Sequence, residues 1–204
     1  MKYHFFWGGI YSNWYKCPIE INRIELERGL IFDTLGRKFN CSEQAMMFFK
    51  ALLFEDYKIA EKIILESNPR KQKALGREIK NFDSESWDLV KEEIVLQILT
   101  CKFKQNFHLR EQLIKENCDL FVEASPYDRI WGIGFDEKNA LNNKDKWGEN
   151  LLGKLITNVR NNLLNHLCAN CGRFDDVVGT HNIDTCEECA LNFIDSDLVI
   201  DNEG

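Results

Sequence analysis

The chain of 204 residues lacks any hydrophobic run approaching the ~20 residues that a membrane-spanning helix needs. Its short apolar patch at residues 4–10 contains two glycines and is not followed by a cleavage-like segment, which argues against a secretory signal peptide. The sequence also has no internal repeat and no low-complexity segment. These absences predict a cytoplasmic globular protein with no membrane partner.

Basic residues are almost missing from residues 161–204, where nine acids face the single base Arg173 and the net charge is −8. Residues 1–160 hold 24 acids and 25 Lys or Arg side chains, so the overall charge of −7 comes from the tail. A nearly neutral main domain can still gather basic side chains around an anionic ligand, and its composition does not demand nucleic acid. The length and the 44% hydrophobic content fit one main domain with a small appendage.

The eight cysteines fall into two groups. Four are irregularly spaced, as expected of thiols in a reducing compartment. The other four form two C-x-x-C pairs separated by 14 residues: Cys168, Cys171, Cys186 and Cys189. Such pairs turn four sulfurs towards one tetrahedral ion, and the insert is long enough for a hairpin, so the spacing predicts a structural zinc ribbon. Two disulfides are the alternative. The expected domains are residues 1–164 and, for the ribbon with its acidic tail, 165–204.

The pattern of apolar residues predicts an α+β fold that is compact and mainly α-helical. Strands are expected at 3–7, 30–33 and 119–123, and helices at 43–54, 56–66, 70–79, 85–105, 108–116 and 149–164. Ser42 is the expected cap of the first helix. The polar stretch 136–146 is expected to be a flexible loop.

Residues 123–134 place two carboxylates, a guanidinium and an indole beside two glycines, which is the chemistry of a site. Ser125-Pro126 favours a turn after the strand at 119–123, so the polar cluster should lie on a loop that a strand holds in place. The two glycines permit the close approach of a ligand. The alternative is a polar surface turn around a buried tryptophan.

The helix at 43–54 is apolar nearly all round and should be buried, which leaves its ionisable groups in need of partners or a function. Glu43 and Lys50 are seven residues apart and therefore lie on one face. An exposed acid with a solvated lysine is the alternative. Trp87 is either core or a stacking platform for a planar ring.

Four basic residues surround the helix at 70–79, and their charges suit either phosphate groups or a solvated face. They are Arg70, Lys71, Lys73 and Arg77.

Several motifs occur in the order typical of one family. They read Phe39-Asn-Cys-Ser-Glu-Gln-Ala-Met-Met-Phe-Phe-Lys-Ala51, Ala74-Leu-Gly-Arg77, Ser86-Trp87, Cys101-Lys-Phe103, the 123–134 stretch, and Trp147-Gly-Glu-Asn-Leu-Leu-Gly153 followed by Val159-Arg160, with Ser12-Asn13 near the start. Over about residues 4–164 the chain thereby resembles the YbiA-like, NADAR (NAD and ADP-ribose) family. The resemblance does not cover the zinc ribbon.

The resemblance implies a domain that cleaves N-glycosidic bonds without an organic cofactor. Known family substrates are ribosylamino pyrimidine intermediates of riboflavin synthesis and ADP-ribose attached to guanine bases. The resemblance implies that Glu43, Lys50 and Asp128 are catalytic. It implies that the substrate is bound by Asn13, Arg77, Trp87, Glu123, Trp131, Gly132 and Asn150. The 136–146 stretch is longer than in some members, so we expect it to bear on substrate size.

Breaking a ribosyl C–N bond builds positive charge on C1′ while the departing nitrogen needs a proton. Glu43 is expected to act as acid/base and cation stabiliser, and Asp128 to position ribose hydroxyls or activate water. Lys50 opens a second route, in which its amine attacks C1′ and forms an imine with the ring-opened sugar.

Two hypotheses from other classes stay open. In one, the domain is a sensor that binds ADP-ribose or NAD without turnover. In the other, the ribbon reads nucleic acid, although a charge of −8 in the tail opposes tight phosphate contact. The sequence leaves open whether the modified base is free or part of ADP-ribosylated DNA or RNA.

Overall fold

The computed structural model describes residues 1–169, 171–176, 185–187 and 189. The chain divides into two compact units, Met1–Val159 and Arg160–Gly204, and the division falls inside the last helix. Within the described residues, no helix combines the length and apolar character required to cross a bilayer.

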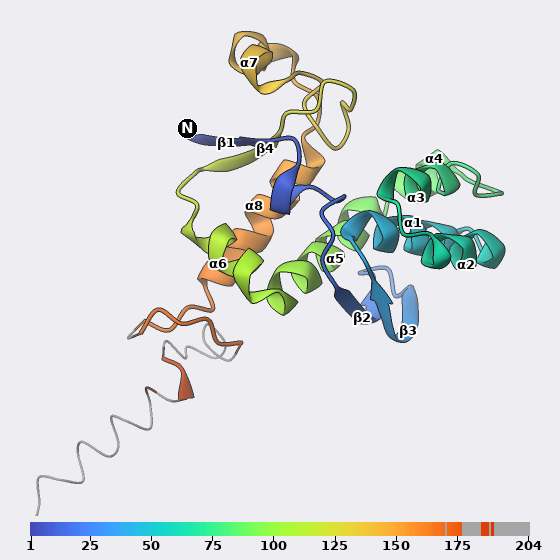
Figure 1. The fold of residues 1–204 in the computed structure, drawn as a ribbon, viewed down its shortest axis with the longest axis horizontal. Coiled ribbons are helices and arrows are strands. Elements are labelled where there is room, and N and C mark those ends of the chain that lie inside the picture. Colours follow the sequence, from blue (N-terminus) through green and yellow to red (C-terminus); the bar gives the residue numbers. More distant parts are fainter. Residues whose placement is uncertain (170, 177–184, 188, 190–204) are drawn as a thin grey trace, which may run out of the picture. The chain divides into compact units, whose positions relative to one another are not determined.

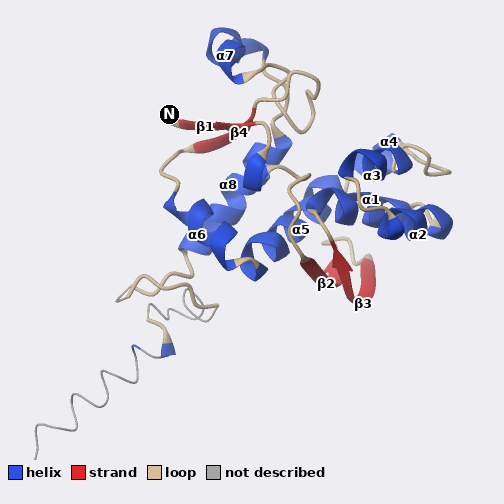
Figure 2. Ribbon diagram, viewed as in Figure 1, coloured by secondary structure: helices blue, strands red, loops and turns tan. Residues whose placement is uncertain are grey.

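The first unit is mainly helical, and its strands form two separate pairs (Figures 1 and 2). This arrangement confirms the predicted α+β class. The strands are β1 (Tyr3–Phe6), β2 (Ile19–Glu25), β3 (Ile31–Phe39) and β4 (Leu120–Glu123). The helices are α1 (Ser42–Leu53), α2 (Tyr57–Leu65), α3 (Pro69–Leu75), α4 (Ser84–Asp88), α5 (Lys91–Gln105), α6 (Phe107–Lys115), α7 (Glu137–Ala140) and α8 (Leu151–Leu164), with 3-10 turns η1 (Gly9–Tyr11) and η2 (Leu141–Lys146).

The strands β1 and β4 pair in parallel, with Tyr3 opposite Leu120 and Phe6 opposite Glu123. The first turns of α8 pack against β4, where the Thr157 hydroxyl accepts a hydrogen bond from the Phe121 amide at 3.0 Å. Because parallel strands end at the same edge, the loops that follow β1 and β4 begin side by side. That edge is where the cavity described below lies.

Helix α1 forms the centre of the apolar core. Nine of its twelve residues are buried, as its all-round apolar sequence predicted. The helix starts one residue earlier than the predicted cap at Ser42 requires, because Cys41 takes the N-cap position and Ser42 is already helical. The Gln44 amide donates to the Ile63 carbonyl at 2.9 Å and ties α1 to the end of α2.

The hairpin β2–β3 was only half predicted. The buried isoleucines of β2 lose their alternation at a bulge between Ile21 and Arg23, so the sequence lacks the period of two that marks a strand. Strand β3 continues beyond the predicted end at residue 33, although Leu35 and Gly36 adopt left-handed conformations with φ of 52° and 79°.

Two further expectations were wrong. The helix expected at 85–105 is broken between α4 and α5, where Val90 leaves the helical region with φ −130°. The break lets α4 turn Trp87 towards the cavity while α5 keeps Ile94 and Ile98 in the core.

The stretch 136–146 is not a flexible loop but contains α7 and η2. Asp136 caps α7 by accepting a hydrogen bond from the Asn139 amide at 3.0 Å. The Trp147 indole donates to the Ala140 carbonyl at 2.8 Å, and Ala140 packs with Val122 and Ile133 next to β4. A polar sequence therefore becomes ordered because a short cap and one indole fix both of its ends.

Candidate active site

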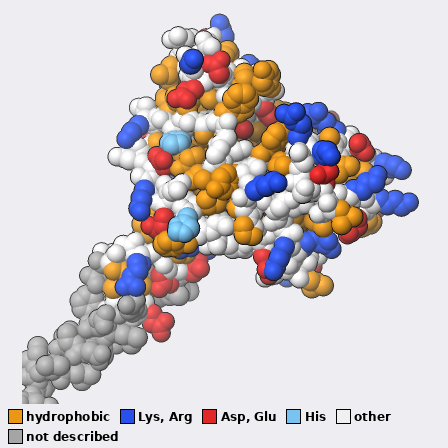
Figure 3. Space-filling model, viewed as in Figure 1, with side chains coloured by type: hydrophobic (Ala, Val, Ile, Leu, Met, Phe, Trp, Pro, Cys, Tyr) orange, Lys and Arg blue, Asp and Glu red, His pale blue; other side chains and the backbone are white. Residues whose placement is uncertain are grey.

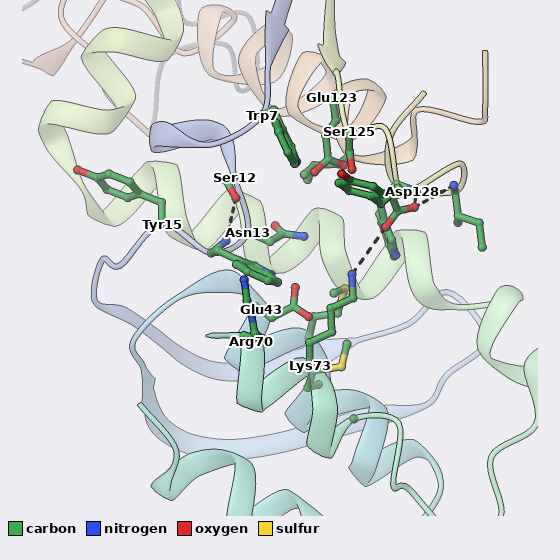
Figure 4. A pocket seen from close by; sticks show the side chains of 18 of the residues that line it. Trp7, Ser12, Asn13, Tyr15, Glu43, Arg70, Lys73, Glu123, Ser125 and Asp128 are labelled. Carbon is green, nitrogen blue, oxygen red and sulfur yellow. Dashed lines mark hydrogen bonds and ion pairs between the residues drawn. The ribbon is translucent and has the colours of Figure 1, made fainter. Parts of the chain in front are cut away.

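A cavity of about 1270 Å³ opens in the first unit. Its wall comes from the loop after β1, from helices α1, α3 and α4, and from the loop after β4 (Figure 4). The lining residues include Trp7, Asn13, Trp14, Glu43, Lys50, Arg70, Lys73, Arg77, Trp87, Glu123, Ser125, Tyr127, Asp128 and Trp131. Eight of the ten catalytic or binding candidates therefore share one cavity.

Glu43 lies in the first turn of α1 and is only 2% exposed. Its amide donates to the Asn13 carbonyl at 2.9 Å, and its carboxylate takes a hydrogen bond from the Trp14 side chain. Its Oε1 is buried without a hydrogen-bond partner in the described part of the chain. Burial raises the pKa of this carboxyl to about 7, against the opposing effects of Lys73 and the Trp14 hydrogen bond.

Glu123 ends β4 and faces the same cavity (Figure 4). Its amide donates to Asn150 Oδ1 at 2.9 Å, which holds the backbone in place. Burial raises the pKa of Glu123 to about 7, and the charges of Asp128 and Glu43 add to this rise while Lys73 opposes it. The site thus contains two carboxyl groups that exchange protons near neutral pH, and such groups are typical of acid/base chemistry.

Asp128 has a different environment from these two acids. Its Oδ1 accepts the amides of Ile130 at 3.0 Å and Trp131 at 2.8 Å, which folds the loop into a tight turn. Its Oδ2 lies 3.7 Å from Lys73 Nζ, an ion pair that bridges the two sides of the cavity (Figure 4). Asp128 therefore shapes the wall and carries Trp131.

Lys50 and Trp87 lie next to each other on the helical side of the cavity. The Lys50 ammonium donates to the Gly76 carbonyl at 3.2 Å and lies 3.9 Å from the Phe82 ring centroid and 5.8 Å from that of Trp87. Burial lowers the pKa of Lys50, and Glu43 opposes the shift. Trp87 is 8% exposed, so it belongs to the core and also forms part of the cavity wall.

Three of the four basic residues around α3 line the cavity, namely Arg70, Lys73 and Arg77. Lys71 instead lies 4.0 Å from Glu66 on the surface. Basic side chains are prominent over the end of the unit that α2 and α3 form (Figure 3). The sequence alone did not distinguish Lys73 from Lys71, because the orientation of α3 in the fold determines which lysine faces the cavity.

The remaining two candidates, Gly132 and Asn150, lie behind the wall and do not line the cavity. A Cβ on Gly132 would come 2.8 Å from the Glu123 carbonyl, so the glycine serves the packing of the loop. Asn150 donates to the Phe121 carbonyl at 2.9 Å and accepts from Glu123. No residue of 136–146, all of which are described, lines the cavity, so the stretch forms no part of the cavity wall, and its bearing on substrate size stays a prediction.

Four aromatic rings contribute to the rim without having been candidates. Trp7 and Tyr127 are strongly exposed, and their ring centroids are 6.1 Å apart. Trp14 and Tyr15 belong to the loop that also carries Asn13. Three of them, Trp7, Trp14 and Tyr15, belong to the aromatic-rich run around Gly8-Gly9 and Ser12-Asn13, which is the signal in the sequence that could have indicated them.

The second unit contains the cysteine cluster. The four sulfurs of Cys168, Cys171, Cys186 and Cys189 lie within 4.8 Å of one another, and none of these four cysteines forms a disulfide. Cys171 Sγ and Cys186 Sγ are 3.8 Å apart, close to the ~3.8 Å edge of a tetrahedron with Zn–S bonds of ~2.3 Å. The cluster can therefore hold a metal ion. The hairpin predicted between the two pairs lies mostly in 177–184, outside the described residues.

The fold and the cavity define a small, mainly helical α+β domain with a buried acid pair, aromatic walls and basic residues at its edge. Comparison with known families is specific: the NADAR domain model matches residues 5–164, and the chain belongs to the NADAR family. This confirms the family that the motifs indicated.

Three relatives illustrate the match. An N-glycosidase of Acanthamoeba polyphaga mimivirus is 38% identical over 169 residues, covering 78% of this chain and 95% of that protein. The N-glycosidase YbiA of Escherichia coli is 28% identical over 155 residues, covering 76% and 81%. Its NMR structure superposes with a TM-score of 0.60 at 26% identity, covering 79% of this chain and 84% of that one. A riboflavin biosynthesis protein of Vibrio vulnificus is 25% identical over 168 residues, which are 39% of its length.

Proposed function

We propose that the chain is an N-glycosidase that hydrolyses a ribosyl C–N bond, with ADP-ribose attached to a guanine base as its preferred substrate. A ribosylamino-pyrimidine phosphate is the related second candidate. The observation that carries the proposal is the pair of cavity carboxyls, Glu43 and Glu123, whose pKa values are both raised to about 7. The names of the mimivirus and E. coli relatives support the activity, and that of the Vibrio relative supports the second substrate.

The cavity chemistry matches the reaction. As the C–N bond breaks, C1′ and the ring oxygen become positive, and an ionised carboxylate close by stabilises that charge in a site with little water. Glu43 can supply this carboxylate, since it is almost fully buried next to the cavity. The departing nitrogen needs an acid, which a carboxyl with a pKa near 7 can provide at neutral pH.

The walls suit a nucleotide-sized ligand. Typical small-molecule pockets measure about 300 to 1,000 Å³, so a cavity of about 1270 Å³ has room for two phosphates, two sugars and a base. Trp87 and Trp131 can hold planar rings by stacking, and Arg70 with Arg77 can hold phosphate oxygens. The size of the cavity is the reason that ADP-ribose ranks above a ribosylamine monophosphate.

Lys50 keeps the second chemical route open. Its lowered pKa makes the free amine more accessible, and the amine is close enough to Glu43 for their charges to interact. Borohydride added during turnover traps a sugar adduct on Lys50 if an imine forms. Turnover without such an adduct assigns the reaction to direct attack by water.

For the second unit we propose a structural Zn²⁺, held by the four cysteines in a closed site that leaves no position for a substrate. The ribbon then stabilises its own fold or contacts another protein, and the cytoplasm is the compartment that suits four cysteines without a disulfide.

The test is to offer purified protein two substrates side by side, an oligonucleotide with ADP-ribosylated guanine and a ribosylamino-pyrimidine phosphate. We expect release of ADP-ribose from the first at the higher kcat/KM. Release of ribose phosphate alone would identify the ribosylamino-pyrimidine phosphate as the substrate. Tight binding of ADP-ribose with no release from either would make the domain a sensor and overturn the enzymatic proposal.

A further inference from the structure

We propose that Glu123, and not Asp128, is the catalytic acid that protonates the departing base, with Glu43 as its ionised partner. The inference rests on the proposed N-glycosidase function and assigns roles within the same cavity. Three carboxyl groups face this space from different elements: Glu43 from α1, Glu123 from the end of β4, and Asp128 from the following loop.

Asp128 is already engaged through both oxygens. One accepts two backbone amides, at 3.0 Å from Ile130 and 2.8 Å from Trp131, and the other lies 3.7 Å from the Lys73 ammonium. These contacts use both oxygens of Asp128 to hold the loop and its Trp131 in place, so we assign Asp128 a positioning role.

Glu123 has the opposite environment. Its Oε2 is buried and has no hydrogen-bond partner among the described residues. Its backbone is fixed on both sides, because its amide donates to Asn150 Oδ1 at 2.9 Å and its carbonyl accepts from the Ile133 amide at 3.0 Å. A rigid strand end thus projects an unpaired carboxyl into the cavity. A neutral carboxyl with a free O–H is the form that such a site favours.

The charges around the two glutamates divide their roles. The pKa of Glu43 is lowered by Lys73, by a hydrogen bond from Trp14 and by Arg77, and of the neighbouring acids Asp128 raises it. Glu123 feels the anions Asp128 and Glu43, and of the cavity cations only Lys73 lowers its proton affinity. The Trp14 hydrogen bond and the second cation favour the charged form of Glu43, so we place the shared proton on Glu123 and the negative charge on Glu43.

The proton balance follows from this division. The C1′–N bond breaks, its electron pair stays on nitrogen, and nitrogen takes the Glu123 proton. Water adds to C1′ and gives its proton to Glu43, which was ionised. One proton then returns from Glu43 to Glu123 through solvent, and the products are the free base and the hydrolysed sugar.

The leaving group provides the test. Guanine linked through nitrogen needs a proton to depart, whereas the pyridinium of NAD⁺ departs as neutral nicotinamide and needs none. We expect Glu123→Gln to lower kcat for ADP-ribosyl guanine by about 10²-fold and to change kcat for NAD⁺ cleavage by less than about threefold. Glu61→Gln is the matched control, because Glu61 is an exposed glutamate whose carboxylate lies 3.6 Å from Arg37. It should alter neither rate.

An equal loss with both substrates, or no loss with either, would overturn the role of Glu123. If the wild type cleaves the guanine substrate but not NAD⁺, the test is the decrease of kcat at alkaline pH, which is measured for the wild type and for Glu123→Gln. The Glu123→Gln variant loses this decrease if Glu123 is the acid and keeps it if another group is. A wild type that releases no base from either substrate would instead refute the proposed function itself.

Discussion

The substitution Glu43→Gln should make the first unit more stable and much less active. Burial raises the pKa of Glu43 from 4.5 to about 7. A rise of about 2.5 pKa units corresponds to about 3 kcal/mol of penalty on the ionised form. Because the folded-state pKa is the higher one, the stability contributed by this group is full below pH 4.5 and is lost as the pH rises through 7. Glutamine is neutral at every pH and avoids the penalty.

The predicted difference therefore depends on pH. At pH 8 the variant should exceed the wild type by up to about 3 kcal/mol in free energy of unfolding, and at pH 4 the two should agree. Urea titrations followed by tryptophan fluorescence measure this, since all five tryptophans, up to Trp147, lie in the first unit. At the same time kcat for base release should fall by about 10²-fold or more.

The exposed Glu61 again serves as the control, and Glu61→Gln should show no comparable dependence on pH. A Glu43→Gln protein that is less stable than the wild type at pH 8 would contradict the claim that ionised Glu43 destabilises the folded state. So would a stability difference of the same size at both pH values. Either result would mean that Glu43 is held in the folded state by favourable contacts instead of being kept there for function.

Three further predictions concern other parts of the chain. Lys73→Met removes the cation that lowers the pKa of both glutamates, so the pH optimum of kcat should move upward, and an unchanged optimum would contradict the assigned electrostatics. Lys102→Met removes a buried ammonium that donates to the Ser12 carbonyl at 3.0 Å, so the loop carrying Trp14 should loosen and kcat should fall. The free energy of unfolding in urea should change by less than about 2 kcal/mol, because the cost of burying the charge disappears together with the hydrogen bond. Cys171→Ser should abolish zinc retention in metal analysis but leave base release intact, and a loss of activity would show that the ribbon serves the cavity.

The sequence predicted most of the helical framework and most of the cavity. The all-round apolar character of α1 indicated that Glu43 is buried, and the cluster around α3 indicated basic residues near the ligand. Both inferences are local, because a helix converts spacing in the sequence directly into faces in space.

The role proposed for Glu123 could not be predicted in the same way. Its burial depends on the parallel pairing of β4 with β1, and these strands are more than a hundred residues apart in the sequence. The assignment of different roles to Asp128 and Glu123 also depends on the amides of Ile130 and Trp131, which reach Asp128 only in the folded loop. Strand β2 was missed for a related reason, since a bulge set by pairing with β3 removed its alternation.

The pairing of an ionised Glu43 with a protonated Glu123 is tested by the pH dependence of kcat/KM for release of ADP-ribose from ADP-ribosylated guanine by the wild-type protein. The proposed reaction requires Glu43 ionised and Glu123 protonated, and the pKa values of both groups are raised to about 7. We expect a bell-shaped profile with its maximum near pH 7 and loss of rate on both sides. A profile that is flat between about pH 5 and pH 9 would contradict it.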